Sequence, residues 1–120
     1  MYTTDSRWSL TLKTENTQRI KGMIGFARRA GKTVIGTELI CRAMPTGTLK
    51  LVVISNTASA PTIKKLTTKA EYYGIAAVES DIDTESLASL LGKGGAVAAV
   101  GVTDTAFADE IIKAKSSDQL

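Results

Sequence analysis

Apolar residues along this chain follow two spacings, one typical of amphipathic helices and the other typical of strands. In five stretches they recur every three or four residues, and four short apolar runs lie between those stretches. The run over residues 49–54 is almost continuously apolar, which is typical of a strand covered on both faces. The alternation of helices and strands predicts an α/β fold, a three-layer α/β/α sandwich.

Residues that cap or stop helices give the expected ends of these elements. Ser, Thr, Asp and Asn cap helix N-termini, Pro fits the first turn, and Gly ends a helix in the left-handed conformation. The expected helices run from Thr14 or Asn16 to Gly31, from Thr37 to the stop at Pro45, from Ser59 or Ala60 to Gly74, from Asp83 or Thr84 through Leu91, and from Asp104 through Ile112. The expected strands cover residues 34–35, 49–54, 75–78 and 96–102.

The first residues do not share the helical spacing. Trp8, Leu10 and Leu12 alternate weakly with polar residues, so we expect residues 1–15 to form a flexible extension that can add an edge strand. A single domain then spans residues 16–114, because 120 residues support one ordinary domain and not two. Residues 115–120 are expected to form a flexible tail.

Composition narrows the class of protein. The chain is 43% hydrophobic and 22% charged, which is typical of globular proteins, and no apolar run approaches the ~20 residues that cross a membrane. One cysteine and no histidine leave no internal disulfide and too few ligands for structural zinc. The N-terminus lacks the pattern of a signal peptide. We therefore expect a cytoplasmic monomer that uses no metal, cofactor or membrane.

The net charge of +3 at pH 7 conceals a division along the chain. Between Thr17 and Ala70 ten basic residues accompany one acidic residue, Glu38, whereas from Glu71 onward nine acidic residues accompany three lysines. A basic segment attracts polyanions, because Lys and Arg near phosphates release condensed counterions and steer association. Nucleic acid is therefore the first class of partner to consider.

Glycine-rich segments and acidic residues offer little catalytic chemistry. Gly31, Lys32 and Thr33 close a helix, whereas a phosphate-binding loop leaves a strand and opens a helix. The acids over residues 79–85 fit a solvated helix start better than a catalytic or metal site, and Cys41 has no histidine to activate it. We therefore expect no enzymatic activity.

Three segments carry a resemblance to a known family. ARRAGK at residues 27–32 precedes GTELICR at residues 36–42, and KAEYYGI follows at residues 69–75. Over about residues 17–113 the chain resembles the ribosomal protein L7Ae/L30e family of kink-turn RNA binders, in particular its bacterial YlxQ-type branch of ribosome-associated RNA-binding proteins. The resemblance implies a four-stranded mixed sheet of the L30e type. It also implies that structured RNA, ribosomal RNA foremost, is the partner, with ribosomal proteins as further partners.

In the kink-turn binders of that family, a glycine-led turn opens a helix whose Asn, Glu and Lys contact sheared G·A pairs. The resemblance places Gly36 at the glycine, Glu38 at the Asn, Leu39 at the Glu and Arg42 at the Lys. Arg42 keeps a positive charge that can bind a phosphate or a guanine edge. Glu38 and Leu39 replace the Asn and Glu that contact the RNA bases in the family. We therefore do not expect this chain to recognise a standard kink-turn in the standard way.

The second RNA contact of that family is an apolar patch before the last strand, which the resemblance places at residues 94–97. A tight turn that leads into a core strand explains these small residues equally well. Flanking basic residues come from segments that can converge at one end of the sandwich. The candidate RNA-binding residues are Arg28, Arg29, Lys32, Gly36, Thr37, Glu38, Arg42, Lys93, Gly94, Gly95, Ala96 and Val97.

Two other hypotheses stay open. In the first, the acidic half from Glu71 onward docks a basic ribosomal or RNA-processing protein, and RNA contact is incidental. In the second, the chain is an enzyme for a small molecule, which requires a deep pocket lined by convergent acids. The lysines at positions 64, 65 and 69 fit either a binding surface or a solvated helix face.

Overall fold

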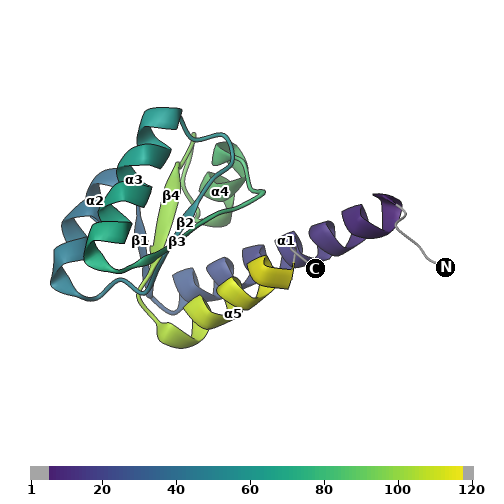
Figure 1. The fold of residues 1–120 in the computed structure, drawn as a ribbon, viewed down its shortest axis with the longest axis horizontal. Helices are drawn as coiled ribbons and strands as arrows, with labels where there is room; N and C mark the ends of the chain where they lie inside the picture. The colour runs from purple at the N-terminus through teal and green to yellow at the C-terminus, as the bar shows by residue number, and fades with distance from the viewer. Residues whose placement is uncertain (1–5, 118–120) are drawn as a thin grey trace.

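The computed structural model describes the backbone of residues 6–117 and the side chains of residues 14–116. Residues 1–5 and 118–120, which belong to the expected extension and tail, lie outside the described residues. Figure 1 shows the elements of the described part. They are α1 (Ser6–Arg29), β1 (Thr33–Ile35), α2 (Thr37–Ala43), the 3-10 helix η1 (Met44–Thr46), β2 (Leu51–Ile54), α3 (Ala60–Tyr73), β3 (Ala76–Glu79), α4 (Thr84–Leu90), β4 (Ala99–Val102) and α5 (Thr105–Ser117).

The four strands form one mixed sheet in the order β1-β4-β2-β3. Strand β4 pairs antiparallel with both β1 and β2, and β2 pairs parallel with β3. Strands β1 and β2 therefore point in the same direction, and the helices that follow them, α2 and α3, begin at the same end of the sheet. The expectation of an α/β fold with a four-stranded mixed sheet is confirmed.

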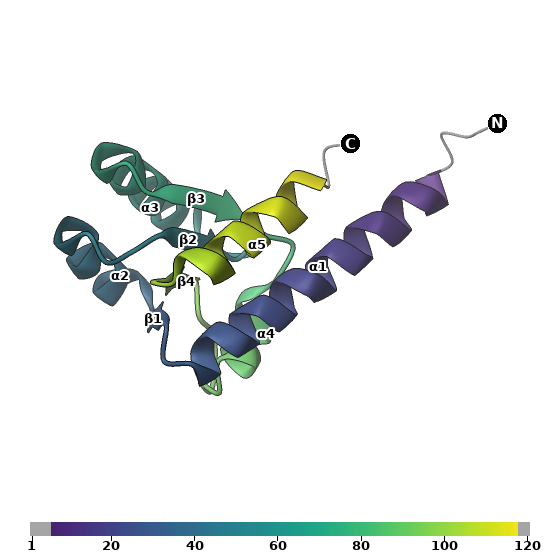
Figure 2. The ribbon, with the colours of Figure 1, turned by 90° about the horizontal axis from the view of Figure 1, so that it is seen from below.

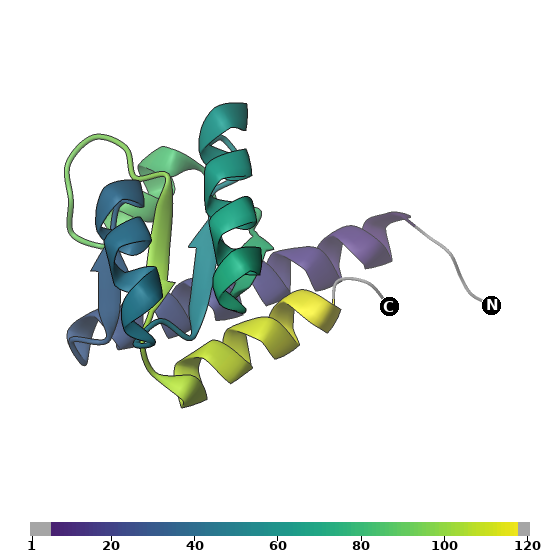
Figure 3. The ribbon, with the colours of Figure 1, turned by 60° about the vertical axis from the view of Figure 1, so that its left-hand side comes forward.

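Helices cover both faces of the sheet (Figures 1 and 3). Helices α1, α4 and α5 enclose one core, in which Ile24 and Leu87 are fully buried. Helices α2 and α3 enclose a second core around Ile40 and Leu66. The four residues of β2 are all buried and alternate between the two cores. Its continuous apolar pattern therefore reflects burial on both faces, as predicted.

Side chains at the starts of three helices satisfy backbone N–H groups that have no partner within the helix. Ser59 accepts a hydrogen bond from the N–H of Thr62 at the start of α3. Asp83 does the same for Ser86 in α4, and the Asp104 carboxylate caps α5. The predicted cap at Asp104 is confirmed. Of the predicted starts Ser59 or Ala60 for α3 and Asp83 or Thr84 for α4, Ser59 and Asp83 are the capping residues.

Several predicted element boundaries are wrong. Strand β2 begins at Leu51 and not at residue 49, and α5 continues through Ser117, so residues 115–117 of the expected flexible tail are helical. Helix α1 begins at Ser6, so residues 6–15 are helical and supply no edge strand; Figure 2 shows this part projecting past the end of α5. Extending an existing helix is favourable because it avoids the free-energy cost of helix nucleation. This advantage is larger than the preference for a strand that a weak apolar alternation gives. Strand β4 begins at Ala99 and not at residue 96, because its two partners end opposite its first residues: Ile54 of β2 pairs with Ala99 and Ile35 of β1 pairs with Val100.

Candidate nucleic-acid interface

The topology brings the start of α2 beside the loop that leads into β4. Gly36 connects β1 to α2, and its N–H donates to the carbonyl oxygen of Ala99 at 3.2 Å. The N–H of Ser55, directly after β2, donates to the carbonyl of Ala98 at 2.9 Å. The loop over residues 91–98 therefore lies at the end of the sheet where α2 begins, and Figure 3 shows it arching past that helix.

The turn into α2 requires glycine. Gly36 has a φ of 100° and a ψ of 147°, a conformation in which a Cβ is costly. Nothing lies within 4 Å of the position that a Cβ would take, so the requirement comes from the backbone and not from packing. Gly36 is also the capping residue of α2, where the sequence had pointed to Thr37, and no side chain caps this helix.

The first turns of α2 present both charged and apolar side chains. Arg42 and Glu38 form an ion pair at 3.5 Å, with side chains 73% and 78% exposed. A pair this exposed contributes at most about 0.5 kcal/mol, so Arg42 can exchange it for a phosphate at little cost. Leu39 lies beside them and is 53% exposed. Leu39 is not among the candidate RNA-binding residues predicted from the sequence. Its position one residue before buried Ile40 turns its side chain about 100° away from the core, which favours exposure.

Arg28, near the end of α1, covers the turn that follows α4. Its guanidinium lies against Gly92, so closely that a Cβ at this glycine would overlap with it. Gly92 has a φ of 69°, and the next residue, Lys93, donates its N–H to the carbonyl of Ala88 at 2.8 Å. Both Arg28 and Lys93 are exposed. The fold thus brings together two predicted basic residues that lie far apart in the sequence.

Two other predicted basic residues occupy different places. The Arg29 guanidinium lies over the ring of Phe26, with 4.8 Å between its central carbon and the ring centroid, a cation–π arrangement. Lys32 precedes β1, and its carbonyl accepts a hydrogen bond from the N–H of Thr103, just beyond the end of β4. Gly36 follows β1, so it lies about 13 Å along the strand from Lys32. The structure does not bring Lys32 to the end of the sheet that holds Gly36.

The loop before β4 offers only a small apolar surface. Gly94, Gly95 and Ala96 are exposed, whereas Val97 is 8% exposed and belongs to the core beneath α1, α4 and α5. The N–H of Val97 donates to the carbonyl of Thr84 at 3.0 Å, which fixes the loop against α4. In this structure Val97 therefore packs as a core residue, and the larger exposed apolar side chain nearby is that of Leu39.

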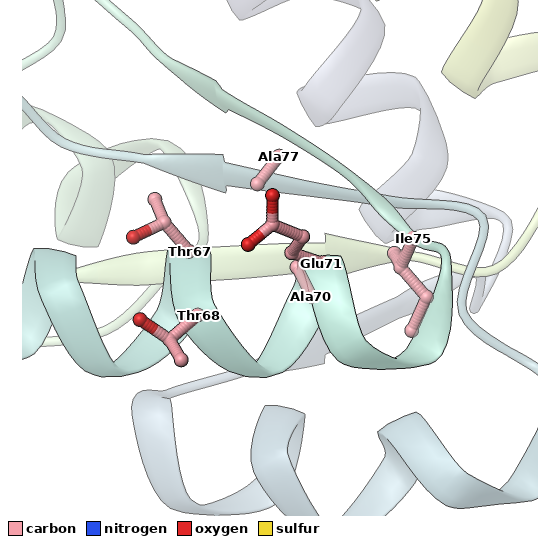
Figure 4. Close-up of a pocket in the computed structure, with 6 residues that line it drawn as sticks. All are labelled: Thr67, Thr68, Ala70, Glu71, Ile75 and Ala77. Atoms are coloured by element: carbon pink, nitrogen blue, oxygen red, sulfur yellow. The ribbon is translucent and has the colours of Figure 1, made fainter.

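The described part of the chain offers little for metal binding or acid–base catalysis. Among the described residues, no three His, Cys, Asp or Glu gather in a group that could hold a metal ion. An open hollow between α3 and β3 contains one ionisable residue, Glu71, among its lining residues (Figure 4). Paired carboxylates for acid–base work are therefore lacking there. No described helix has the length and hydropathy needed to span a membrane.

Two solved structures share this fold. A Bacillus halodurans protein of unknown function matches with a TM-score of 0.76 and 26% identity, covering 82% of this chain and 97% of that protein. A Giardia lamblia 15.5kD RNA-binding protein matches with a TM-score of 0.73 over 88% of each chain. Its 12% identity shows likeness of fold alone.

Sequence comparison adds relatives and a family. Two proteins named RNA-binding protein YlxQ are similar to this chain: one from Enterococcus faecium is 34% identical over 93 residues, covering 78% of this chain and 87% of the relative. One from Bacillus subtilis strain 168 is 37% identical over 92 residues, covering 75% of this chain and 88% of the relative. The model of the ribosomal protein L7Ae/L30e/S12e/Gadd45 family matches residues 18–112, which include α2 and the loop before β4. As the sequence resemblance predicted, the chain belongs to this family.

Proposed function

We propose that this chain is a cytoplasmic, non-enzymatic protein that binds structured RNA, with ribosomal RNA as the first candidate. Its two YlxQ relatives are named RNA-binding proteins, and its family takes its name from ribosomal proteins. The observation that carries the proposal is the hydrogen bond from Gly36 to Ala99, because it joins the first turn of α2 and the loop before β4 into one surface.

Basic side chains on this surface supply the phosphate contacts. Arg28 and Lys93 lie together at Gly92, where the loop before β4 begins and not at the first turn of α2, and no carboxylate of the described residues forms an ion pair with either of them. Among the residues that the structure describes, Arg42 pairs with Glu38 alone, at the surface. These charges are therefore free to neutralise phosphates, and the release of counterions drives the association.

Base contacts differ from those that the family resemblance implies for kink-turn binders. Glu38 accepts hydrogen bonds but cannot donate them as Asn does, and Leu39 has no polar group to offer. The exposed Leu39 side chain instead packs on a base or sugar of the RNA, and exposed Ala96 provides a smaller apolar contact. Recognition then depends on the shape of the folded RNA and on its phosphates more than on the edges of sheared G·A pairs.

Filter binding with fragments of ribosomal RNA tests this function. The double substitution Arg28→Ala and Arg42→Ala should weaken binding about tenfold or more, because it removes two phosphate contacts. Arg19→Ala is a control for the loss of a surface arginine elsewhere: Arg19 pairs with Glu110 of α5 at 3.6 Å, away from the start of α2. Equal affinity of the double variant and the wild-type chain at low salt would refute the proposed interface.

A protein partner is the alternative outcome of this experiment. Glu79 and Asp81 are exposed at the end of β3 and belong to the acidic half of the chain. A basic protein that is retained from nuclease-treated lysate, and released by Glu79→Gln with Asp81→Asn, would favour the adaptor function.

A further inference from the structure

The outer face of α3 carries lysines that the candidate interface does not use. The inner side of this helix packs on the sheet through Leu66 and Ala70, which are buried. At about 100° per residue, Lys64 and Lys65 fall on the side turned away from the sheet, and Lys69 falls on the flank of the helix next to Lys65. They border a shallow hollow in the surface. Its lining residues are Pro61, Lys64, Lys65, Thr68 and Lys69.

The charge of this face is not compensated within the described part of the molecule. No carboxylate there forms an ion pair with Lys64, Lys65 or Lys69. The one acidic residue of α3, Glu71, turns toward Ala77 of β3 (Figure 4). Lys65 and Lys69 are four residues apart on one side of the helix, a like-charged spacing that disfavours the helix unless an anion lies between them. The face therefore suits a chain of phosphates.

An aromatic pair stands at the C-terminal end of the same face. The Tyr72 side chain is 80% exposed, and its position seven residues after Lys65 places it on the lysine side of the helix. The rings of Tyr72 and Tyr73 meet edge to face, with centroids 4.9 Å apart and planes at 87°. Tyr73 thereby limits the orientations of the Tyr72 ring while most of that ring stays open to solvent. Cations next to an open aromatic ring are the combination that holds single-stranded nucleic acid.

We propose that this face of α3 binds a single-stranded RNA segment, with the lysines on successive phosphates and Tyr72 stacked on a base. The inference rests on the proposed function. The single-stranded RNA segment on α3 would continue from the structured RNA that α2 binds. Helices α2 and α3 lie side by side on one face of the sheet and begin at the same end (Figures 1 and 3). From Lys65 to Tyr72 the helix axis advances about 10 Å, the length of roughly three stacked nucleotides.

Fluorescence anisotropy with a labelled uridine oligonucleotide of about 12 nucleotides tests α3 alone, because this RNA forms no base pairs. The triple variant Lys64→Gln, Lys65→Gln and Lys69→Gln should bind it at least about tenfold more weakly, and the slope of log affinity against log salt should fall by about two. Tyr72→Ala should weaken binding about tenfold and leave the salt slope unchanged.

A charge-matched triple variant controls for net charge alone. Lys21→Gln, Lys50→Gln and Lys113→Gln remove the same charge from α1, from the loop before β2 and from α5. This control should keep wild-type affinity for the oligonucleotide. Circular dichroism and thermal unfolding should show that all variants are folded.

The two proposals fail separately. If the α3 triple variant binds the uridine oligonucleotide as tightly as the matched control, the α3 inference is overturned, whereas the effect of Arg28→Ala and Arg42→Ala on structured RNA is unaffected by that result. If the double variant keeps its affinity for structured RNA, the proposed function fails, whatever α3 does. Equal binding of a poly-glutamate peptide and the oligonucleotide, insensitive to Tyr72→Ala, also overturns the inference and indicates an acidic protein partner.

Discussion

Two buried serines that follow neighbouring strands differ in how their hydroxyl groups are satisfied. The Ser80 hydroxyl donates to the carbonyl of Ile54 at 2.9 Å and accepts from the N–H of Ile82 at 3.3 Å. Ser55, which is fully buried, carries a hydroxyl oxygen for which the described residues provide no hydrogen-bond partner. A buried polar group costs free energy when it is unpaired and stabilises the fold when it is paired.

This contrast predicts opposite effects of the same substitution. Ser80→Ala should lower the free energy of unfolding by about 1 kcal/mol, because it leaves the buried N–H of Ile82 without its partner, while the Ile54 carbonyl still accepts from the backbone N–H of Ser80. Ser55→Ala should leave that free energy unchanged or raise it by up to about 1 kcal/mol. Urea denaturation of both variants measures the difference, and equal losses would contradict the assigned hydrogen bonds.

Gly36 tests whether the turn into α2 is set by the backbone. Gly36→Ala places a side chain at a φ of 100° with no neighbour to clash with, so it should cost about 1–3 kcal/mol of backbone strain. Gly22→Ala is the matched control: it lies inside α1, also with open space, and should stabilise the chain by about 0.5–1 kcal/mol through helix propensity. Thermal unfolding that shows the same sign for both variants would disprove the strain at Gly36.

At the scale of elements, α4 depends on the ionised carboxylate that caps it. The Ser86 N–H donates to Asp83 at 2.6 Å, and this hydrogen bond is the main reason that the pKa of Asp83 lies below its usual 3.8. The pKa is lower in the folded chain than in the unfolded chain, so ionised Asp83 stabilises the fold at pH values above the unfolded pKa. This contribution is lost as the pH falls through the folded pKa.

Substitution of the cap should therefore have a pH-dependent effect. Asp83→Ala should lower the melting temperature at pH 7, and the deficit should shrink as the pH is taken down through and below 3.8. Asp83→Asn keeps a capping oxygen and should show a smaller deficit at pH 7. Asp81→Ala removes a charge two residues away without removing a cap and serves as control. A deficit for Asp83→Ala that stays constant between pH 7 and pH 3 would contradict the capping role.

The predicted elements were mostly confirmed because their signals are local. Periodic apolar positions report the buried side of a helix or strand, and Asp104 reports a helix start through one nearby hydrogen bond. The boundaries that failed depend on distant partners. The start of β4 at Ala99 is set by where its partners β2 and β1 end, and no pattern within residues 96–98 contains that information.

At the scale of the whole molecule, the proposed interface unites parts of the basic half with one loop of the acidic half. Arg28 and Arg42 come from α1 and α2, whereas Lys93 follows α4. If these residues bind phosphates, the affinity for structured RNA should fall steeply with salt, and the slope of log affinity against log salt should decrease by about two in the Arg28→Ala, Arg42→Ala variant. Titrations at several KCl concentrations measure it, and an unchanged slope would show that these residues do not contact phosphate.

Local patterns in the sequence were sufficient to predict the α/β class, the order of the elements, the division of charge and the positions that match the family, such as Gly36 and Arg42. These features are encoded by residues within a few positions of one another. The contact of Arg28 with Gly92 and the burial of Val97 follow instead from the packing of segments that are distant in the sequence. Strand order and register join residues that are tens of positions apart, and no local pattern specifies which of them will touch.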